Sequence, residues 1–337
     1  MSEGSLAQNN PHPGLFRVIT QLMKLRVIVL LQITAICAIL IHDTLARQGV
    51  MDVDRSWSQT LWAMVITVLG GTLSAGGSNA INMWYDADID PHMRRTMNRP
   101  IPLGHATPRF ALLFGTFIAT VGSCLFLIIS VKAAFWSAFS VLFYVFVYSI
   151  WLKRRTPQNI VIGGIAGSTP PLIGWAAAAG DSVQNWNMFD LGSPVPWMLF
   201  FLIFLWTPPH FWALALYRSG EYGKVNIPMM NEVKGAKHTI FQSKVYVVCL
   251  FMLGSLPCFW PDAGVPLLWA FVSGGLTLWY AQSVWAIDPH EPFDSNGRMP
   301  KAAKSFFRSL YYLSWMFLSF VLISFIPGEW LGFFGPL

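Results

Sequence analysis

The chain has 337 residues, of which 54% are hydrophobic and only 11% are charged, and its mean hydropathy is +0.50. This composition excludes an ordinary water-soluble domain and predicts several membrane-spanning helices in a lipid bilayer. The formal net charge is +6. The basic residues lie mostly in short segments between apolar stretches, which is typical of a membrane protein and argues against nucleic acid as a partner.

Apolar stretches of about 20 residues, each long enough to cross a bilayer as a helix, recur along the chain. They predict an all-α polytopic membrane protein, a bundle of nine transmembrane helices at 21–41, 60–83, 110–131, 133–151, 157–180, 195–217, 239–261, 263–285 and 307–327. We expect a polar cytoplasmic segment at 1–20, the helical domain at 21–327 and a short tail at 328–337.

The distribution of basic residues predicts the orientation in the membrane. With the N-terminus in the cytoplasm, only Arg47, Arg55 and Lys132 of the 22 Lys and Arg residues lie outside. The positive-inside rule therefore predicts a cytoplasmic N-terminus and a periplasmic C-terminus. Residues 1–14 lack Lys, Arg and an apolar stretch with a cleavage site, which argues against a secretory or mitochondrial leader and favours a bacterial inner membrane.

A dense group of polar residues lies where the second predicted span ends. Asn82, Asp86 and Asp90 recur at four-residue intervals, so on a helix their side chains face the same way. Proteins hold Mg²⁺ through one or two carboxylates together with substrate phosphates, and these oxygens suit that ion. The simpler alternative is a solvated charged loop at the membrane surface.

Basic residues follow this group and recur after the fourth predicted span. Arg95 and Arg99 come soon after Asp90, and Lys153 and Arg154 come directly after an apolar stretch. These cations either follow the general excess of positive charge on inner loops or neutralise the phosphates of a bound ligand.

Two further candidates lie in or after the sixth predicted span. His210 follows Pro208 and Pro209, which should kink the helix, and it is the only one of the seven histidines inside a predicted span. An ionisable residue within a span is a functional candidate, although a neutral histidine bonded to a freed carbonyl is equally compatible. Glu221 is either a second metal ligand facing Asp86 or an ordinary interfacial glutamate.

Together these motifs resemble the UbiA superfamily of intramembrane prenyltransferases. Members carry N-x-x-x-D-x-x-x-D after the second helix and a second acidic motif after the sixth. The resemblance is to the haem-modifying branch, and it rests on an R-T-x-x-R-P pattern within 86–102 and on 152–164, 208–214 and 222–229.

The resemblance implies transfer of a farnesyl group from farnesyl diphosphate to a vinyl group of haem B, giving haem O for haem-copper oxidases, with Mg²⁺ as cofactor. It implies contacts with the bilayer and with haem A synthase or oxidase assembly factors. It assigns catalysis and metal binding to Asn82, Asp86, Asp90 and Glu221, diphosphate binding to Arg95, Arg99, Lys153 and Arg154, and haem binding to His210.

Two departures from the family pattern matter. Val225 stands where quinone-type members usually carry a second acid, which favours the haem branch and weakens the case for a second metal ion. Leu25 replaces the proline of a common K-P-R motif, which predicts a locally straighter first helix.

The alternative functions are an aromatic polyprenyltransferase making a quinone precursor and a secondary transporter. The clustering of acids at one membrane face argues against a transporter.

Overall fold

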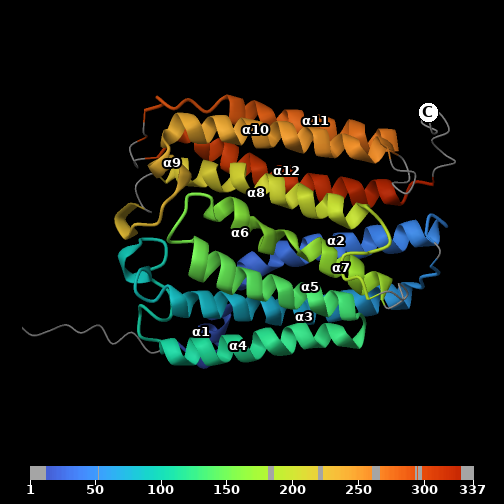
Figure 1. Cartoon of the computed structure of the whole chain (residues 1–337), viewed down its shortest axis with the longest axis horizontal. Coiled ribbons are helices and arrows are strands. Elements are labelled where there is room, and N and C mark those ends of the chain that lie inside the picture. Colours follow the sequence, from blue (N-terminus) through green and yellow to red (C-terminus); the bar gives the residue numbers. More distant parts are fainter. Residues whose placement is uncertain are drawn as a thin grey trace, which may run out of the picture.

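The computed structural model describes residues 13–51, 53–180, 186–218, 223–259, 266–292, 294 and 298–327. In this part of the chain the regular structure consists of helices alone, and the long ones lie side by side in a bundle (Figure 1). The all-α architecture predicted from the apolar stretches is confirmed. The expected segment at 1–20 lies partly outside the described residues, and the tail at 328–337 lies wholly outside them.

Seven helical segments in the described ranges are long and apolar enough to cross a membrane. Three of the seven segments consist of two consecutive helical elements. They are α2 (Leu25–Arg47), α3 (Trp57–Tyr85), α4 with η2 (Pro108–Leu125, Phe126–Ile128), α5 with η3 (Val131–Leu142, Phe143–Leu152), α6 with α7 (Asn159–Ser168, Pro170–Ala179), α8 (Val195–Tyr217) and α12 (Pro300–Ser324).

Helices α10 (Gly235–Ser255) and α11 (Pro266–Trp285) overlap the seventh and eighth predicted spans. Polar side chains such as Lys244 and Gln282 lower their hydropathy, so neither belongs to the seven. Helices are therefore present at all nine predicted positions, while the membrane crossing of these two stays a prediction. The shorter elements are α1 (Leu15–Met23), α9 (Met230–Val233), η1 (Asp90–His92), η4 (Gly223–Val225) and η5 (Leu256–Phe259).

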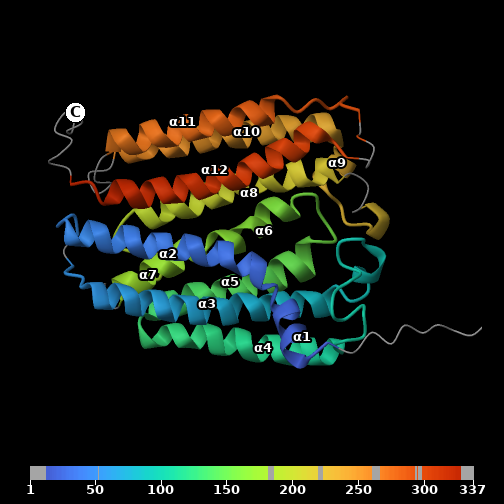
Figure 2. The same ribbon diagram turned by 180° about the vertical axis from the view of Figure 1, so that it is seen from behind.

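The first helix is broken, so the prediction of a straighter helix is wrong. Helix α1 ends at Met23, Lys24 has a left-handed backbone with φ 55° and ψ 51°, and α2 begins at Leu25. The loss of a proline does not keep the helix continuous, because a tertiary contact stabilises the break. The Asn79 amide of α3 donates a hydrogen bond of 2.9 Å to the Met23 carbonyl. Figure 2 shows α1 lying across the ends of α3 and α4.

Glycines set the close packing of α3 against α4. A Cβ atom added to Gly77 would lie 2.4 Å from the carbonyl oxygen of Gly115, and one added to Gly70 would lie 2.9 Å from that of Gly122. Small residues allow helix backbones to approach in this way. The packing holds α3, and with it the acidic residues at its end, against a neighbouring helix.

A buried ionic cluster joins the C-terminal part of α2 to the N-terminal part of α3. His42 and Asp43 are 0% exposed. The Asp43 carboxylate accepts hydrogen bonds from His42 Nδ1 at 2.7 Å, Thr60 Oγ1 at 2.6 Å and Arg55 Nε at 3.0 Å. His42 lies inside α2, because that helix extends beyond the predicted span. The expectation that His210 is the only histidine within a span is therefore wrong.

Replacing Asp43 with leucine is expected to lower the free energy of unfolding by about 3 to 5 kcal/mol. The change leaves His42 and Arg55 without the acceptor that they share, while Thr60 keeps its bond to the Ser56 carbonyl. Thermal unfolding in detergent measures the effect. Asp54→Asn, at an exposed position nearby, is the matched control. Equal melting temperatures for the two variants would show that the cluster does not stabilise the fold.

Four polar connections lie together at one end of the bundle (Figure 1). They follow α3, η3, α8 and α11. Their described parts are 86–107, 153–158, 218 with 223–234, and 286–299 with gaps at 293 and 295–297. The sequence predicts that all four face the cytoplasm. The structure brings them to one end, while the side of the membrane they face stays a prediction.

Candidate active site

The acidic residues at the end of α3 are buried. The amide of Asp86 donates to the carbonyl of Asn82 at 3.0 Å, and the amide of Asp90 donates to the carbonyl of Asp86 at 2.9 Å. Helical spacing therefore continues past the last residue of α3 into η1. Asn82 is 4% exposed, and Asp86 and Asp90 are each 1% exposed. For these three residues the alternative of a solvated loop is wrong.

Cations from two connections pair with these acids. Lys153 Nζ donates to Asp86 Oδ2. Arg99 Nη1 donates to both carboxylate oxygens of Asp90, at 2.8 and 2.7 Å. The structure therefore brings together two acids and two cations that the sequence predicted as parts of one site.

Arg154 pairs with an acid that the sequence did not assign. Its two terminal nitrogens reach the Asp88 oxygens at 2.7 Å each. One of them also donates to the Tyr85 carbonyl at 3.0 Å and lies 3.9 Å from Asp86 Oδ1. Asp88 is 61% exposed. This pair therefore lies at the rim of the site.

The surroundings shift the pKa values of several groups. Burial raises the pKa of Asp90 although Arg99 acts in the opposite direction. Burial lowers the pKa of Lys153, which the Asp86 carboxylate partly offsets. The hydrogen bonds from Arg154 lower the pKa of Asp88. The charges of the buried Asp90 and Lys153 interact with their partners more strongly than they would in solvent.

One carboxylate oxygen remains without a hydrogen bond. Asp86 Oδ1 is buried and has no hydrogen-bond partner among the described residues. A buried carboxylate oxygen of this kind is a suitable ligand for a hard cation. In the described ranges no group of three His, Cys, Asp or Glu side chains is placed to hold a metal ion. Substrate phosphates commonly complete the coordination of Mg²⁺ in proteins. Glu221, the other predicted metal ligand, lies outside the described residues.

A π-helical segment supplies a residue that sequence reasoning missed. Within η3 the Ser149 hydroxyl donates to the Tyr144 carbonyl at 2.9 Å and accepts a 3.0 Å bond from the Asn82 amide. The Lys153 amide bonds to the Tyr148 carbonyl five residues earlier, at 2.9 Å. Segments of π-helix often occur at functional sites. This one holds Ser149 and Lys153 against the end of α3.

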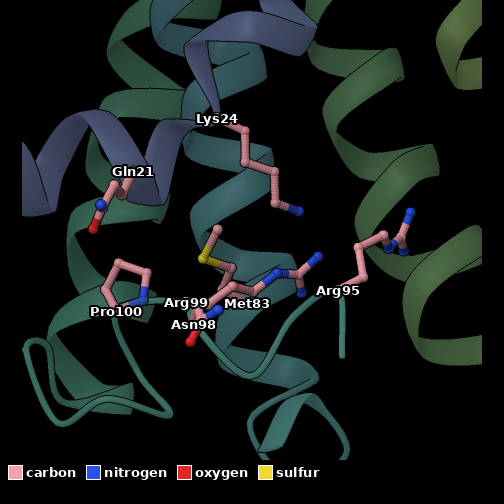
Figure 3. Close-up of a pocket in the computed structure, with 7 residues that line it drawn as sticks. All are labelled: Gln21, Lys24, Met83, Arg95, Asn98, Arg99 and Pro100. Atoms are coloured by element: carbon pink, nitrogen blue, oxygen red, sulfur yellow. The ribbon is translucent and has the colours of Figure 1, made fainter. Parts of the chain in front are cut away.

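A cavity of about 280 Å³ opens beside these residues (Figure 3). The cations Lys24, Arg95 and Arg99 line it, and no carboxylate does. The remaining lining residues are Gln21, Met83, Asn98 and Pro100. We call this cavity the cationic pocket, because its composition suits an anion.

Lys24 is the second residue that sequence reasoning missed. Its side chain enters the cationic pocket, and its Nζ donates to Asn82 Oδ1 at 3.4 Å. Burial, then the positive charges of Arg99 and Lys153, lower the Lys24 pKa well below its usual value. In the sequence it is an ordinary basic residue near the start of the first predicted span, 21–41. No local signal indicates that it faces residues near position 82.

His210 lies in another part of the bundle. Helix α8 continues through both prolines without a break. The imidazole stacks between Trp206 and Phe306, with ring centroids at 4.2 and 4.7 Å. Its Nδ1 lies 2.6 Å from the Ser309 hydroxyl of α12. The hydrogen-bond partner is thus a side chain, and the alternative of a carbonyl freed by the prolines is wrong.

Comparison with known sequences gives consistent matches. The sequence profile of the UbiA prenyltransferase family matches residues 49–311. The chain is 45% identical over 254 residues to the protoheme IX farnesyltransferase of Parvibaculum lavamentivorans, covering 74% of each chain. It is 40% identical over 263 residues to the enzyme of the same name from Bartonella bacilliformis, covering 77% of this chain and 79% of that one.

Solved structures share the fold at low sequence identity. A structure of digeranylgeranylglyceryl phosphate synthase matches 92% of this chain and 98% of its own, with a TM-score of 0.67 at 16% identity. A UbiA homologue from Archaeoglobus fulgidus bound to DMAPP and Mg²⁺ matches 90% of this chain and 99% of its own, with a TM-score of 0.62 at 13% identity. The family profile, the sequence identities and the fold agree. The chain belongs to the UbiA prenyltransferase family and is a multi-pass membrane protein.

Proposed function

We propose that the chain is a haem O synthase, which transfers a farnesyl group from farnesyl diphosphate to a vinyl group of haem B. The observation that carries this proposal is the 40 to 45% identity, over about three quarters of the chain, to enzymes named protoheme IX farnesyltransferase. The cationic pocket beside buried carboxylates supports it, since a diphosphate head requires such a site.

The difficult step is heterolysis of the allylic carbon–oxygen bond. Its electron pair leaves on the diphosphate, farnesyl C1 bonds to the terminal vinyl carbon, and a water oxygen bonds to the other vinyl carbon and releases a proton. Negative charge therefore grows on the diphosphate oxygens. Lys24, Arg95 and Arg99 in the cationic pocket, with Lys153 and Arg154 at its side, would stabilise this charge from fixed positions.

The acidic residues fit a divalent cation. Asp86, through Oδ1, which has no hydrogen bond from the described residues, would hold Mg²⁺ together with Asp90, and Asn82 and Glu221 are the further expected ligands. The A. fulgidus homologue with bound DMAPP and Mg²⁺ supports the use of a divalent cation. When bound, Mg²⁺ would act as a Lewis acid toward the diphosphate oxygens. Lys153 would keep Asp86 in place through Oδ2.

Haem would bind at His210. The Ser309 hydroxyl donates to the Phe306 carbonyl at 2.6 Å, so it accepts the hydrogen on His210 Nδ1. This assigns the lone pair to Nε2, the atom that would ligate haem iron. A histidine ligand commonly donates its other N–H to a fixed acceptor in this way.

Replacing His210 with alanine is expected to abolish the spectral change on adding haem B to the purified protein. Ser309→Ala is expected to weaken haem binding by about 10- to 100-fold, because the imidazole loses the contact that orients it. Titration of haem B followed by absorbance measures both. Ser314→Ala, at an exposed position one to two turns later on α12, is the control. Unchanged haem affinity in His210→Ala would exclude this role.

We also propose where the enzyme acts. The end of the bundle with the cationic pocket would face the cytoplasm of a bacterial cell, with the chain in the inner membrane and its C-terminus in the periplasm. The excess of Lys and Arg on that side supports this orientation. The product would pass to haem A synthase or to oxidase assembly factors.

Mass spectrometry of the porphyrins in proteoliposomes tests the function. With farnesyl diphosphate, haem B and Mg²⁺, we expect a porphyrin that carries both a farnesyl group and one added water. A prenylated aromatic ring with unmodified haem would instead identify a quinone-precursor enzyme. The names of the relatives favour the first outcome.

A further inference from the structure

We propose that Asn79 is a positioning residue for diphosphate binding: it holds the backbone turn at Lys24 and thereby places the Lys24 ammonium group in the cationic pocket. The inference rests on the proposed function of that pocket. Asn79 itself is not among the residues that line the pocket.

The turn is a conformation that Lys24 would not adopt without support. With φ 55° and ψ 51° the backbone is left-handed, which is unfavourable for a residue with a Cβ atom. Such a conformation persists only where its surroundings stabilise it. The local hydrogen bonds are the long one from the Lys24 amide to the Gln21 carbonyl, 3.3 Å, and one from the Val27 amide to the Lys24 carbonyl, 2.9 Å.

Helix α3 supplies the support at the residue just before the turn. The buried Asn79 amide donates to the Met23 carbonyl at 2.9 Å. This carbonyl belongs to the last residue of α1, where no amide of the same helix is available as a donor. One turn earlier, a Cβ atom added to Gly76 would lie 2.6 Å from the end of the Met23 side chain. Met23 therefore packs directly against α3.

The next polar residue on the same face of α3 meets the Lys24 side chain. Asn82 lies three residues after Asn79, so the two side chains project from neighbouring positions on one face. Asn79 holds the backbone, while Asn82 Oδ1 accepts the bond from Lys24 Nζ. Figure 3 shows the Lys24 side chain extending from the junction of α1 and α2 into the pocket. The left-handed turn gives the side chain this direction.

The charges in the pocket explain why the turn needs a fixed support. Lys24 shares the pocket with Arg95 and Arg99, which repel its ammonium group. A lysine side chain is flexible and would otherwise move away into water. A rigid backbone keeps the cation in place before the anion arrives, which reduces the cost of ordering the site on binding.

A double-mutant cycle tests the proposal with inorganic pyrophosphate and Mg²⁺ as the probe, by isothermal titration calorimetry of the full-length protein. Asn79→Ala and Lys24→Gly are each expected to raise the Kd about tenfold. Glycine adopts the left-handed turn without strain and carries no ammonium group. The double variant is therefore expected to bind like Lys24→Gly alone. A hundredfold loss in the double variant, or an unchanged Kd for Asn79→Ala, would overturn the proposal.

Two further variants separate positioning from general stability. Asn79→Leu keeps most of the side-chain volume without the donor and is expected to show the same tenfold loss. Gln32→Ala removes hydrogen bonds of 3.3 Å to Val68 and Thr72 across the same α2–α3 interface. Gln32→Ala is expected to leave the Kd for pyrophosphate unchanged. A tenfold loss of affinity in this variant as well would overturn the proposal.

The cycle and the product assay fail independently. Wild-type protein that makes farnesylated haem while Asn79→Ala binds pyrophosphate normally would leave the proposed function intact and refute the role of Asn79. If the protein made no farnesylated haem but the effects of Asn79→Ala and Lys24→Gly on pyrophosphate binding were coupled, the role of Asn79 would stand and the proposed function would be refuted.

Discussion

Replacing Asp86 with asparagine is expected to lower the rate of farnesyl transfer by about 100- to 1,000-fold. The change removes the buried negative charge that would hold Mg²⁺ and that pairs with Lys153. Groups that stabilise charge in a dry site contribute to the rate by this order of magnitude. Quantifying farnesylated haem by mass spectrometry in reconstituted membranes, across a range of Mg²⁺ concentrations, measures the effect.

Asp88→Asn is the matched control, because Asp88 lies two residues away and is 61% exposed. Its pair with Arg154 is an exposed ion pair, and such pairs contribute about 1 kcal/mol or less, so the rate should fall about fivefold at most. If Asp86→Asn retained Mg²⁺-dependent turnover close to wild type, the assignment of Asp86 as a metal ligand would be refuted.

Replacing Arg99 with leucine is expected to have two effects. The Asp90 carboxylate, 1% exposed, loses the cation that contacts both of its oxygens, which should lower the free energy of unfolding by about 3 to 5 kcal/mol. The cationic pocket also loses one of its three cations, so turnover should fall about 100-fold. Thermal unfolding in detergent and the product assay measure the two effects separately.

Arg94→Leu controls for the loss of one positive charge on the same connection. Arg94 is exposed and does not line the pocket. Its substitution should change neither quantity beyond the scatter of replicate measurements. A variant Arg99→Leu that was as stable and as active as Arg94→Leu would show that the contact with Asp90 has neither role.

The positions of the apolar helices and of the polar triplet Asn82, Asp86 and Asp90 follow from local sequence. Hydropathy is a property of about 20 consecutive residues, so each span can be read without knowledge of its neighbours. The alignment of Asn82, Asp86 and Asp90 likewise follows from the geometry of one helix. The likeness to a known family placed these acids in one diphosphate site with Lys153 and Arg99, which spacing alone left open.

The predictions from sequence were wrong where contacts between helices determine the local structure. A missing proline at position 25 predicted a straighter helix, yet the Asn79 bond to Met23 and the packing at Gly76 stabilise a break. His42 was placed outside the first span because the apolar stretch ends before it. Its bond to Asp43, which Arg55 and Thr60 also contact, allows these polar residues to be buried inside α2.

For the acidic end of α3, the sequence by itself determined which residues carry the oxygens, that they share a helix face, and which connections are rich in positive charge. Only the tertiary structure decided that these oxygens are buried, that Lys153 and Arg99 are their partners, and that Lys24 and Ser149 belong to the same site. The reason is distance along the chain. Lys24 lies 58 residues before Asn82, and Ser149 lies 67 residues after it. Helix packing brings them together.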